Sequence, residues 1–287
     1  MIDALTQTYC IIGNPVRHSF SPIMQNQAFQ EAGLNSVYTT FEVTDLEGAV
    51  NGIRALGIHG ASVTIPHKIG VMQYLDEIED IAAMIGSVNT IVNRDGRLSG
   101  TNTDAYGFYR ALTETVDVDG KNIALLGSGG AARAIAFALF YFGKPAKLEI
   151  AVRNEDIDDA KHLRKSLIAY LALPEESVGV VPLVKWNDIG DNVDIIINST
   201  PLGMHPNTEV SPLAKEQIRK GITVMDIVYH PRDTLLLRNA VEQGCRTVSG
   251  IDMLLYQGVK QFELWTGVDA PESVMRDALM QHLQKSH

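Results

Sequence analysis

This chain has few cysteines and no long apolar run, and each of these features excludes some classes of protein. Cys10 and Cys245 are the two cysteines among 287 residues and form no C-x-x-C pair, so we expect reduced thiols, with a single bridge as the less favoured alternative. The longest apolar run, residues 134–142, is too short to cross a bilayer. The N-terminus carries Asp3 and lacks the basic and apolar regions of a signal peptide. The sequence therefore predicts a cytoplasmic protein that does not bind membranes.

The chain also has fewer basic than acidic residues. It contains 24 lysine and arginine residues and 34 acidic residues, which gives a formal net charge of −10. With no local cluster of basic residues, this balance argues against a nucleic-acid or lipid-headgroup surface but still permits small anionic ligands. The eight histidines form no H-E-x-x-H, H-x-H or Cys/His cluster, so no metal site is predicted. The sequence also lacks a G-x-S-x-G elbow.

The most informative segment is IALLGSGGAARAI at residues 123–135, where four apolar residues lead through a glycine turn into an alanine-rich helical run. Gly127, Gly129 and Ala132 fall in the G-x-G-x-x-G/A register of a dinucleotide-binding turn. Gly127 permits the tight turn, Gly129 lets the backbone approach a pyrophosphate, and Ala132 lets the helix pack near the strand. A tight turn without a ligand is the alternative interpretation of this segment.

Strands and helices alternate on both sides of the glycine turn. Before it we expect strands at residues 9–13, 36–43 and 60–65, a hairpin at 87–101 turning at 95–96, and helices at 22–32, 46–56, 78–85 and 104–115. Ser21 is expected to cap the first of these helices, and the segment 102–104, with Asp104 as a good cap residue, is expected to cap the last. After it the clearest strands are 147–152, 193–199 and 223–228, with closing helices at 253–266 and 272–283. The alternation predicts an α/β protein of two domains with mostly parallel sheets.

Polar residues gather at the predicted strand ends of the first half, where open α/β sheets bind ligands. They are Ser19, Ser21, Thr64, Lys68, Asn89 and Asp104. Hydroxyls, an amide, a carboxylate and an ammonium together suit a small polyhydroxy acid. Taken singly, Ser21 and Asp104 are explained as helix caps and Lys68 as an ordinary solvated lysine. Trp186 and Trp265 are expected to be packing residues.

Short motifs along nearly the whole chain resemble, in order, the signature set of the shikimate dehydrogenase family. They are GNPVRHSFSP at 13–22, VTIPHK at 63–68, GSVNT at 86–90, NTD at 102–104, NSTPLGM at 198–204, DIVYHP at 226–231, and GIDMLLYQG at 250–258 followed by FELW at 262–265. The resemblance implies a reversible hydride transfer between 3-dehydroshikimate with NADPH and shikimate with NADP⁺, within chorismate and aromatic amino acid biosynthesis. It also implies a Rossmann-type NAD(P)-binding domain at residues 105–251 and an N-terminal substrate-binding domain formed by residues 1–104 and 252–287.

The same resemblance implies roles for individual residues. Lys68 and Asp104 would form the catalytic pair, with Lys68 as proton donor and acceptor. The substrate-binding residues would be Ser19, Ser21 and Tyr229 at the carboxylate, and Thr64, Lys68, Asn89, Asp104 and Gln257 at the ring oxygens. The cofactor-binding residues would be Gly127, Ser128, Gly129, Gly130, Ala131, Ala132, Arg153, Asn154, Thr200, Val228 and Gly250.

The chain departs from the family pattern in a few places. Ser62 stands where the family's N-V-T-x-P motif usually has asparagine, and Ala105 stands where glycine is common after Thr-Asp. Family members that use NADP often carry N-R-T after the second strand of the cofactor domain, whereas here V-R-N precedes Glu155 and Asp156. Arg153 favours NADP through its extra phosphate. Either acid would instead accept hydrogen bonds from the ribose of NAD, or simply begin the next helix.

Three hypotheses stay open from the sequence. The leading one is an NADP-dependent shikimate dehydrogenase, with NAD as the alternative cofactor. The second is a quinate/shikimate dehydrogenase that uses NAD, since quinate differs from shikimate by one more hydroxyl. The third is a cofactor-binding regulator that has lost the chemistry, although both Lys68 and Asp104 are retained. The expected partners are a small-molecule substrate (shikimate, 3-dehydroshikimate or quinate) and neither nucleic acid nor membrane, in a monomer or homodimer.

Overall fold

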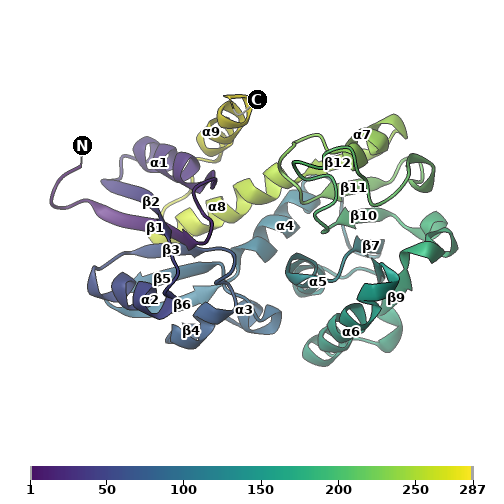
Figure 1. Ribbon diagram of the computed structural model, residues 1–287, viewed down its shortest axis with the longest axis horizontal. Coiled ribbons are helices and arrows are strands. Elements are labelled where there is room, and N and C mark those ends of the chain that lie inside the picture. The colour runs from purple at the N-terminus through teal and green to yellow at the C-terminus, as the bar shows by residue number, and fades with distance from the viewer. Residues whose placement is uncertain (1, 286–287) are drawn as a thin grey trace. The chain divides into compact units, whose positions relative to one another are not determined.

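The computed structural model describes residues 2–285 and divides into two compact units. Unit 1 combines the chain up to Tyr106 with the chain from Leu255 onward, and unit 2 is the intervening segment Gly107–Leu254. The chain passes from one unit to the other within two helices, α4 (Thr103–Thr113) and α8 (Gly250–Thr266), both labelled in Figure 1. Each unit contains its own β-sheet.

Unit 1 is built on a mixed sheet with the strand order β2-β1-β3-β5-β6-β4. Its strands are β1 (Gln7–Gly13), β2 (Ser36–Glu42), β3 (Gly60–Val63), β4 (Glu77–Ile78), β5 (Thr90–Arg94) and β6 (Arg97–Thr101). β1, β2 and β3 are parallel, β5 is antiparallel to both its neighbours, and β4 is parallel to β6. The predicted hairpin is confirmed, with Asp95 and Gly96 both at positive φ (54° and 88°) between β5 and β6.

Helices cover both faces of the unit 1 sheet. They are α1 (Ser21–Glu31), α2 (Leu46–Ala55), α3 (Asp80–Ile85), the 3₁₀ turn η1 (Gly70–Tyr74), the second half of α8, and α9 (Glu272–Lys285). α2, η1 and α3 contribute Val50, Val71 and Ala82 to one core cluster with β1 and β3. α1 and α9 lie side by side, as Figure 1 shows.

Side chains of β1 alternate between the two faces, as the period of a strand requires. Cys10 and Ile12 belong to the cluster beneath α2. Tyr9 faces the other way and stacks on Phe29 of α1 and Trp265 of α8, with ring centroids 5.0 and 5.4 Å apart. Trp265 therefore brings the C-terminal part of the chain into the core formed by the N-terminal part.

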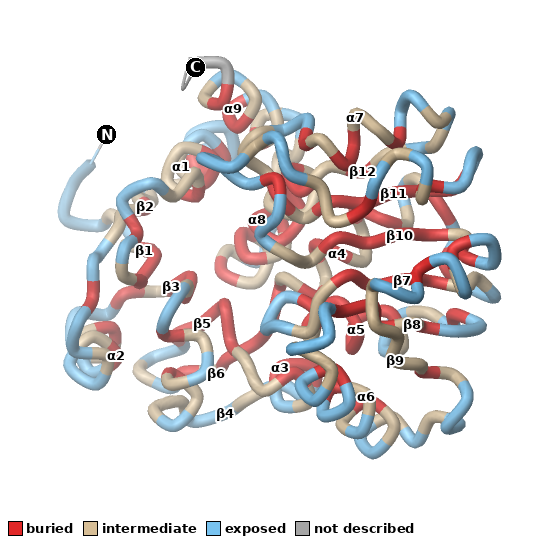
Figure 2. The backbone as a smooth tube through the Cα atoms, turned by 45° about the vertical axis from the view of Figure 1, so that its right-hand side comes forward, coloured by how far each residue is buried: buried red, intermediate tan, exposed pale blue. Residues whose placement is uncertain are grey.

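Unit 2 contains a fully parallel sheet with the strand order β12-β11-β10-β7-β8-β9. Its strands are β7 (Asn122–Leu126), β8 (Lys147–Val152), β9 (Val178–Pro182), β10 (Ile195–Asn198), β11 (Thr223–Asp226) and β12 (Arg246–Ser249). Counted from β7, this is the 3-2-1-4-5-6 order of the Rossmann fold. Figure 2 shows β7, β10 and β11 red over most of their length, because both faces of these central strands are covered. The predicted Rossmann-type sheet is confirmed.

The strands of unit 2 are connected mainly by helices. These are α5 (Gly130–Phe142), α6 (Ile157–Leu171), α7 (Leu235–Glu242) and the 3₁₀ segments η2 (Asn154–Asp156), η3 (Glu175–Ser177), η4 (Leu183–Asp188), η5 (Gly190–Asn192) and η6 (Lys215–Gln217). Trp186 of η4 packs in one core cluster with Leu126 of β7 and Leu236 of α7. Trp186 and Trp265 are only 2% and 3% exposed, so both are packing residues, as predicted.

The predictions of Ser21 and Asp104 as helix N-caps are wrong. At α1, Phe20 takes the N-cap position and Ser21 is the first helical residue, because the Ser21 side chain is buried against the sheet. At α4, the cap is Asn102, whose Oδ1 accepts from the Ala105 N–H at 3.2 Å. Asp104 consequently sits in the first turn of α4, where its carboxylate is available for another contact.

Several element ends also differ from prediction. α3 begins at Asp80 and not at residue 78, because Glu77–Ile78 forms the short strand β4 beside β6. β3 ends at Val63, ahead of the predicted residue 65, and α8 begins at Gly250, ahead of the predicted residue 253. Across residues 2–285, no helix combines the length and the apolar character needed to span a membrane.

Candidate functional site

The predicted substrate residues of unit 1 lie at one edge of its sheet. β1, β3 and β6 run in the same direction, so their carboxyl ends share an edge, and the antiparallel β5 begins at that edge. Ser19 and Ser21 follow β1, Thr64 and Lys68 follow β3, Asn89 precedes β5, and Asp104 follows β6. The fold therefore gathers at one edge residues that are far apart in the sequence.

Lys68 and Asp104 form an ion pair at this edge, with Nζ 2.5 Å from Oδ2. The two side chains are 30% and 19% exposed, so the pair is sheltered but open to solvent. The loop that carries Lys68 is tied down on both sides. The Lys68 carbonyl accepts from the Val88 N–H at 2.8 Å, and the His67 ring Nε2 lies 2.8 Å from the Val43 carbonyl oxygen. A fixed ammonium with solvent access is suited to donating a proton.

Asn89 is buried, and its carboxamide is held through its oxygen. Oδ1 accepts from the Thr103 N–H at 2.7 Å, from Thr90 Oγ1 at 2.8 Å and from Thr103 Oγ1 at 3.2 Å. Because these donors engage the oxygen, the amide nitrogen is the group that Asn89 offers to a ligand. Thr103 directly precedes Asp104, so the same hydrogen bonds also fix the start of α4.

The hydroxyl groups near β1 and β3 are also fixed by neighbours. The side chains of Ser62 and Ser21 hydrogen-bond the Tyr38 hydroxyl. Burial raises the pKa of Tyr38 and these hydrogen bonds oppose only part of the rise, so Tyr38 stays protonated. Thr64 packs its methyl group over Gly13, where a Cβ would lie 2.3 Å from Thr64 Cγ2. Residue 13 therefore has to be glycine for Thr64 to take this position.

The predicted cofactor residues lie at the carboxyl edge of the parallel sheet in unit 2. Residues 127–132 follow β7, Arg153 and Asn154 follow β8, Thr200 follows β10, Val228 follows β11, and Gly250 follows β12. The strand order reverses between β7 and β10, which makes this edge the topological switch point of the sheet. Open α/β sheets bind their ligands in the crevice at that point.

The glycine turn leaves open space at the start of α5. Gly127 has a φ of 106°, a conformation that favours glycine, and a Cβ there would also be crowded, 3.0 Å from Ser199 Oγ. Within the part of the chain that the structure describes, no heavy atom lies within 4 Å of the Cβ position of Gly129 or Gly130 beyond their immediate neighbours. The space that side chains would fill at the start of α5 is thus open, which suits the close approach of a phosphate to the backbone.

Arg153 is engaged by the two acids that follow it. Nη1 lies 2.9 Å from Glu155 Oε1, and Nε lies 2.8 Å from Asp156 Oδ2. The hydrogen bond to Asp156 and the charges of both acids raise the pKa of Arg153. The Arg153 side chain is 64% exposed, so a ligand phosphate would compete with these carboxylates in a screened environment.

Asp226 ties together the loops that carry Thr200 and Val228. Its buried carboxylate accepts from Thr234 Oγ1 at 2.7 Å, Asn198 Nδ2 at 3.0 Å and the Val228 N–H at 3.1 Å. Asn198 Oδ1 in turn accepts from the N–H and the hydroxyl of Thr200, at 3.0 and 2.7 Å. Burial raises the pKa of Asp226 to about 6 despite its hydrogen bonds, which lower it. Asp226 belongs to the motif at 226–231, but no sequence signal pointed to this role.

The remaining predicted residues fall in both units. Tyr229, expected near the substrate carboxylate, belongs to unit 2, and burial raises its pKa. Gly250 opens α8 where a Cβ would lie 2.3 Å from the Ile227 carbonyl oxygen, so only glycine lets α8 begin this close to the end of β11. Gln257, further along α8, is a buried residue of unit 1.

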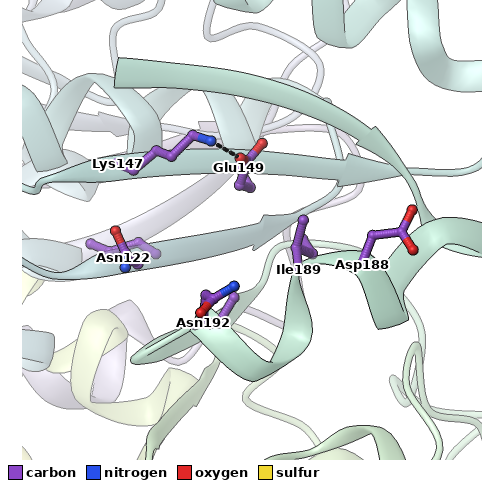
Figure 3. Close-up of a pocket in the computed structure, with 8 residues that line it drawn as sticks. Asn122, Lys147, Glu149, Asp188, Ile189 and Asn192 are labelled. Atoms are coloured by element: carbon purple, nitrogen blue, oxygen red, sulfur yellow. Dashed lines mark ion pairs between the residues drawn. The ribbon is translucent and has the colours of Figure 1, made fainter. Parts of the chain in front are cut away.

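A cavity in unit 2 lies away from these residues. It has a volume of about 200 Å³ and is bordered by Asn122, Lys147, Glu149 and Asp188 (Figure 3). Asn122 and Lys147 begin β7 and β8, so the cavity is at the amino edge of the sheet, opposite the glycine turn. Its lysine already pairs with Glu149 at 2.6 Å, as the dashed line in Figure 3 marks. Among residues 2–285, no three His, Cys, Asp or Glu side chains are grouped as a metal site would require.

A 3-2-1-4-5-6 parallel sheet with an open glycine turn at its switch point defines a dinucleotide-binding unit. A lysine–aspartate pair among hydroxyl and amide groups, in a second α/β unit, suits proton transfer to a polyhydroxy substrate. Together these features define a nicotinamide-dependent oxidoreductase.

Comparisons with known proteins identify the family. The shikimate dehydrogenase substrate binding domain matches residues 11–91, and the shikimate 5'-dehydrogenase C-terminal domain matches residues 250–280. A Methanocaldococcus jannaschii protein named shikimate dehydrogenase (NADP(+)) is 44% identical over 290 residues, covering 99% of this chain and 100% of its own. The chain belongs to the shikimate dehydrogenase family, as its motifs predicted.

Solved structures agree with this family. The crystal structure of a shikimate dehydrogenase in complex with NADP⁺ has a TM-score of 0.92 at 44% identity, covering 99% of this chain and 98% of that chain. A quinate dehydrogenase from Corynebacterium glutamicum in complex with NAD has a TM-score of 0.89 at 30% identity, with 96% and 99% covered. The fold is thus shared by relatives that differ in both named substrate and bound cofactor.

Proposed function

We propose that this protein is an NADP-dependent shikimate dehydrogenase, which reversibly reduces 3-dehydroshikimate to shikimate in the synthesis of chorismate and the aromatic amino acids. The observation that carries the proposal is the ion pair of Lys68 and Asp104, 2.5 Å apart at an edge lined with hydroxyl and amide groups. A relative with 44% identity over nearly the whole chain bears this name. We assign substrate binding to unit 1 and cofactor binding to unit 2, with the domain boundaries near residues 104 and 252.

The substrate oxygens are assigned to groups of matching hydrogen-bonding character. The carboxylate is assigned to the hydroxyls of Ser19 and Ser21, and the ring hydroxyls to Thr64, Asn89, Asp104 and Gln257, whereas the role of Tyr229 at the carboxylate stays a prediction from the family resemblance. A ring hydroxyl both donates and accepts. Asn89 has its oxygen engaged by Thr103 and Thr90, so its amide nitrogen donates, and the Asp104 carboxylate accepts. Asn89 and Asp104 would thus supply the donor and the acceptor for one ring hydroxyl.

Lys68 is assigned the proton transfer. When bound, the nicotinamide supplies or removes a hydride at the substrate carbon. In the reduction, the Lys68 ammonium donates a proton to the ketone oxygen, which becomes a hydroxyl. In the oxidation, neutral Lys68 takes that proton back. Asp104, whose Oδ2 lies 2.5 Å from Lys68 Nζ, orients the lysine through their ion pair.

NADP is assigned to the carboxyl edge of the unit 2 sheet. The open space beside Gly129 and Gly130 fits a pyrophosphate that has to approach the backbone closely. Arg153 is assigned to the 2′-phosphate, because a guanidinium matches phosphate geometry. Asp226 would position Thr200 and Val228 at the same edge through its hydrogen bonds.

One observation favours a second candidate, a quinate/shikimate dehydrogenase that uses NAD. Arg153 is paired with both Glu155 and Asp156, which offsets its attraction for the phosphate of NADP and keeps two carboxylates close by. A relative named quinate dehydrogenase is known in complex with NAD. A cofactor-binding regulator without activity is the third hypothesis, and a cytoplasmic location and a monomeric or dimeric state stay predictions.

The test is an initial-rate assay by nicotinamide absorbance, in which shikimate and quinate are each offered NADP⁺ and NAD⁺. Rapid turnover only with shikimate and NADP⁺ is the expected result. Comparable rates with NAD⁺ or quinate would favour the second candidate. Cofactor binding without turnover in any combination would leave the regulator as the better explanation.

A further inference from the structure

Ser62, at the position where the family pattern usually has asparagine, lies in a buried chain of hydrogen bonds in unit 1. Tyr38 Oη donates to Ser62 Oγ at 2.7 Å, and Ser62 Oγ donates to Gln261 Oε1 at 2.9 Å. Gln261 Nε2 donates to Thr90 Oγ1 at 3.0 Å, and Thr90 Oγ1 donates to Asn89 Oδ1 at 2.8 Å. These five residues, named here the amide network, are each at most 4% exposed.

The amide network joins two parts of the proposed substrate site. At one end Ser21 hydrogen-bonds Tyr38, and at the other Asn89 Oδ1 also accepts from the N–H of Thr103, which precedes Asp104. Each hydroxyl has a single proton to donate. The hydrogen bonds of the network therefore all run in one direction, with Tyr38 Oη as the first donor and Asn89 Oδ1 as the last acceptor. Gln261 accepts on one side and donates on the other, and its carboxamide therefore sets the direction of the whole chain of hydrogen bonds.

The space beside residue 62 holds one carboxamide. An asparagine there would place its Cγ about where Ser62 Oγ now lies, and its amide atoms about 1.2 Å farther out. Gln261 Oε1 is only 2.9 Å from Ser62 Oγ, so the two amides would overlap. Serine at 62 and glutamine at 261 are consequently matched to each other.

We infer that Gln261, from α8, supplies the carboxamide that the family pattern places at residue 62, and that it is a positioning residue for substrate binding. It acts through Thr90. Because Gln261 Nε2 donates to Thr90 Oγ1, the Thr90 proton is directed to Asn89 Oδ1. There it reinforces the Thr103 N–H in holding that oxygen and leaves the Asn89 amide nitrogen for the substrate. This inference rests on the proposed function for the identity of the substrate, whereas the exchange of one amide for the other does not depend on it.

The test is a double-mutant cycle of Gln261→Ala and Ser62→Asn, read by KM for shikimate, kcat and Tm. Gln261→Ala removes the partner of two buried hydroxyls and should raise KM about tenfold, with a smaller change in kcat. Ser62→Asn crowds Gln261 and should also raise KM. The double variant has one carboxamide again, and its KM should return to within about threefold of the original value. A double variant no better than the combined single effects would overturn the inference.

Gln25→Ala is the matched control. Gln25 is another fully buried glutamine of unit 1, and its Nε2 donates to the Gly258 carbonyl of α8 at 2.9 Å, outside the amide network. Its loss should lower Tm and leave KM for shikimate unchanged. If Gln261→Ala shows the same behaviour, Gln261 has only a structural role and the inference is wrong.

One further variant and the Tm values of the cycle keep the outcome decisive. Gln261→Met fills the same space without hydrogen bonds and should raise KM even if the alanine variant does not fold. If the unmodified protein shows no turnover of shikimate, the proposed function fails. The Tm values of the cycle then still decide whether an asparagine at 62 replaces Gln261, because recovery of Tm in the double variant needs no substrate.

Discussion

Asn198 and Asp226 lie directly opposite each other on the parallel strands β10 and β11, and Asn198 Nδ2 donates to Asp226 Oδ1 at 3.0 Å. Burying a carboxylate is costly unless hydrogen bonds compensate for the lost water. Here the hydrogen bonds come from the segments that hold Thr200 and Val228 in place. The charge of Asp226 therefore bears on the stability of unit 2 as well as on the proposed cofactor site.

Asp226 is expected to make stability fall as pH rises from about 4 to 7. Burial raises the pKa of Asp226 from 3.8 to about 6, so over this range the folded state binds a proton that the unfolded state has released. The contribution is complete below about pH 4 and is lost as pH passes 6, on the order of 3 kcal/mol in all. Asp226→Asn should therefore gain unfolding free energy relative to the original protein as pH rises, as measured by urea unfolding.

Asp76→Asn is the control for this pH dependence. The Leu98 N–H and the Arg54 guanidinium lower the pKa of Asp76, so its carboxylate is ionised in both states above about pH 5. Above pH 5, this variant should keep the original slope of stability against pH. If the slope of stability against pH in Asp226→Asn equalled that of the original protein, Asp226 would have an ordinary pKa in the folded state.

Lys68→Ala should lower kcat by at least ~10²-fold, the usual scale for losing a general acid–base group, while shikimate binding changes less. Lys147→Ala is the matched control, since Lys147 also forms a partly exposed ion pair, with Glu149 at 2.6 Å, but at the amino edge of the unit 2 sheet. Its kcat should be unchanged. Equal losses of binding and turnover in Lys68→Ala would make Lys68 a substrate-holding residue and not the proton donor.

Arg153→Ala should raise KM for NADP⁺ at least about tenfold, because a charge-assisted contact to phosphate is lost. The double variant Glu155→Gln with Asp156→Asn should lower KM for NADP⁺ about threefold to tenfold, because in the original protein both carboxylates pair with Arg153. NAD⁺ lacks the phosphate and serves as the internal control. Parallel changes in KM for NAD⁺ would place Arg153 away from the 2′-phosphate.

Gly129→Ala should leave Tm unchanged or slightly higher, because φ at Gly129 is −73° and its Cβ position is open. The added methyl group would nevertheless occupy the proposed pyrophosphate space, raising KM for NADP⁺ about tenfold or more. Gly60→Ala is the contrasting variant, since its Cβ would lie 2.3 Å from the Trp265 ring in the unit 1 core. It should lower Tm and leave KM for NADP⁺ unchanged in the folded fraction. A normal KM for NADP⁺ in Gly129→Ala would argue against this phosphate site.

Most helices, strands and turns could be predicted from short sequence patterns of a few residues. Gly86 ends α3 with φ of 74°, and Asp95 with Gly96 forms the hairpin turn, because these conformations are local properties of the residues. The glycine turn after β7 likewise predicted the Rossmann-type sheet. For the candidate site, strand-end position included Lys68 and Asp104 among six polar residues, and the family resemblance implied that the two act as a pair, which the structure shows as an ion pair.

Those short patterns could not predict contacts between segments that are far apart in the sequence. Ser21 looked like a helix cap, but its side chain is drawn to Tyr38, a residue of β2. Gln261 meets Ser62 across a sequence separation of 199 residues, and no periodicity links the two positions. The burial of Asp226 depends on how helices cover the sheet, which hydrophobic pattern alone does not specify.

The order in which the chain is synthesised has a consequence for unit 1. Trp265 packs against Tyr9 of β1 and Phe262 packs against Phe29 of α1, yet the whole of unit 2 is translated between these two sets of residues. A nascent chain that ends before Leu255 thus contains all of unit 2, whereas the aromatic core of unit 1 still lacks Phe262 and Trp265. Unit 2, although second in the sequence, is the part able to fold first on the ribosome, and unit 1 is completed only when α8 emerges.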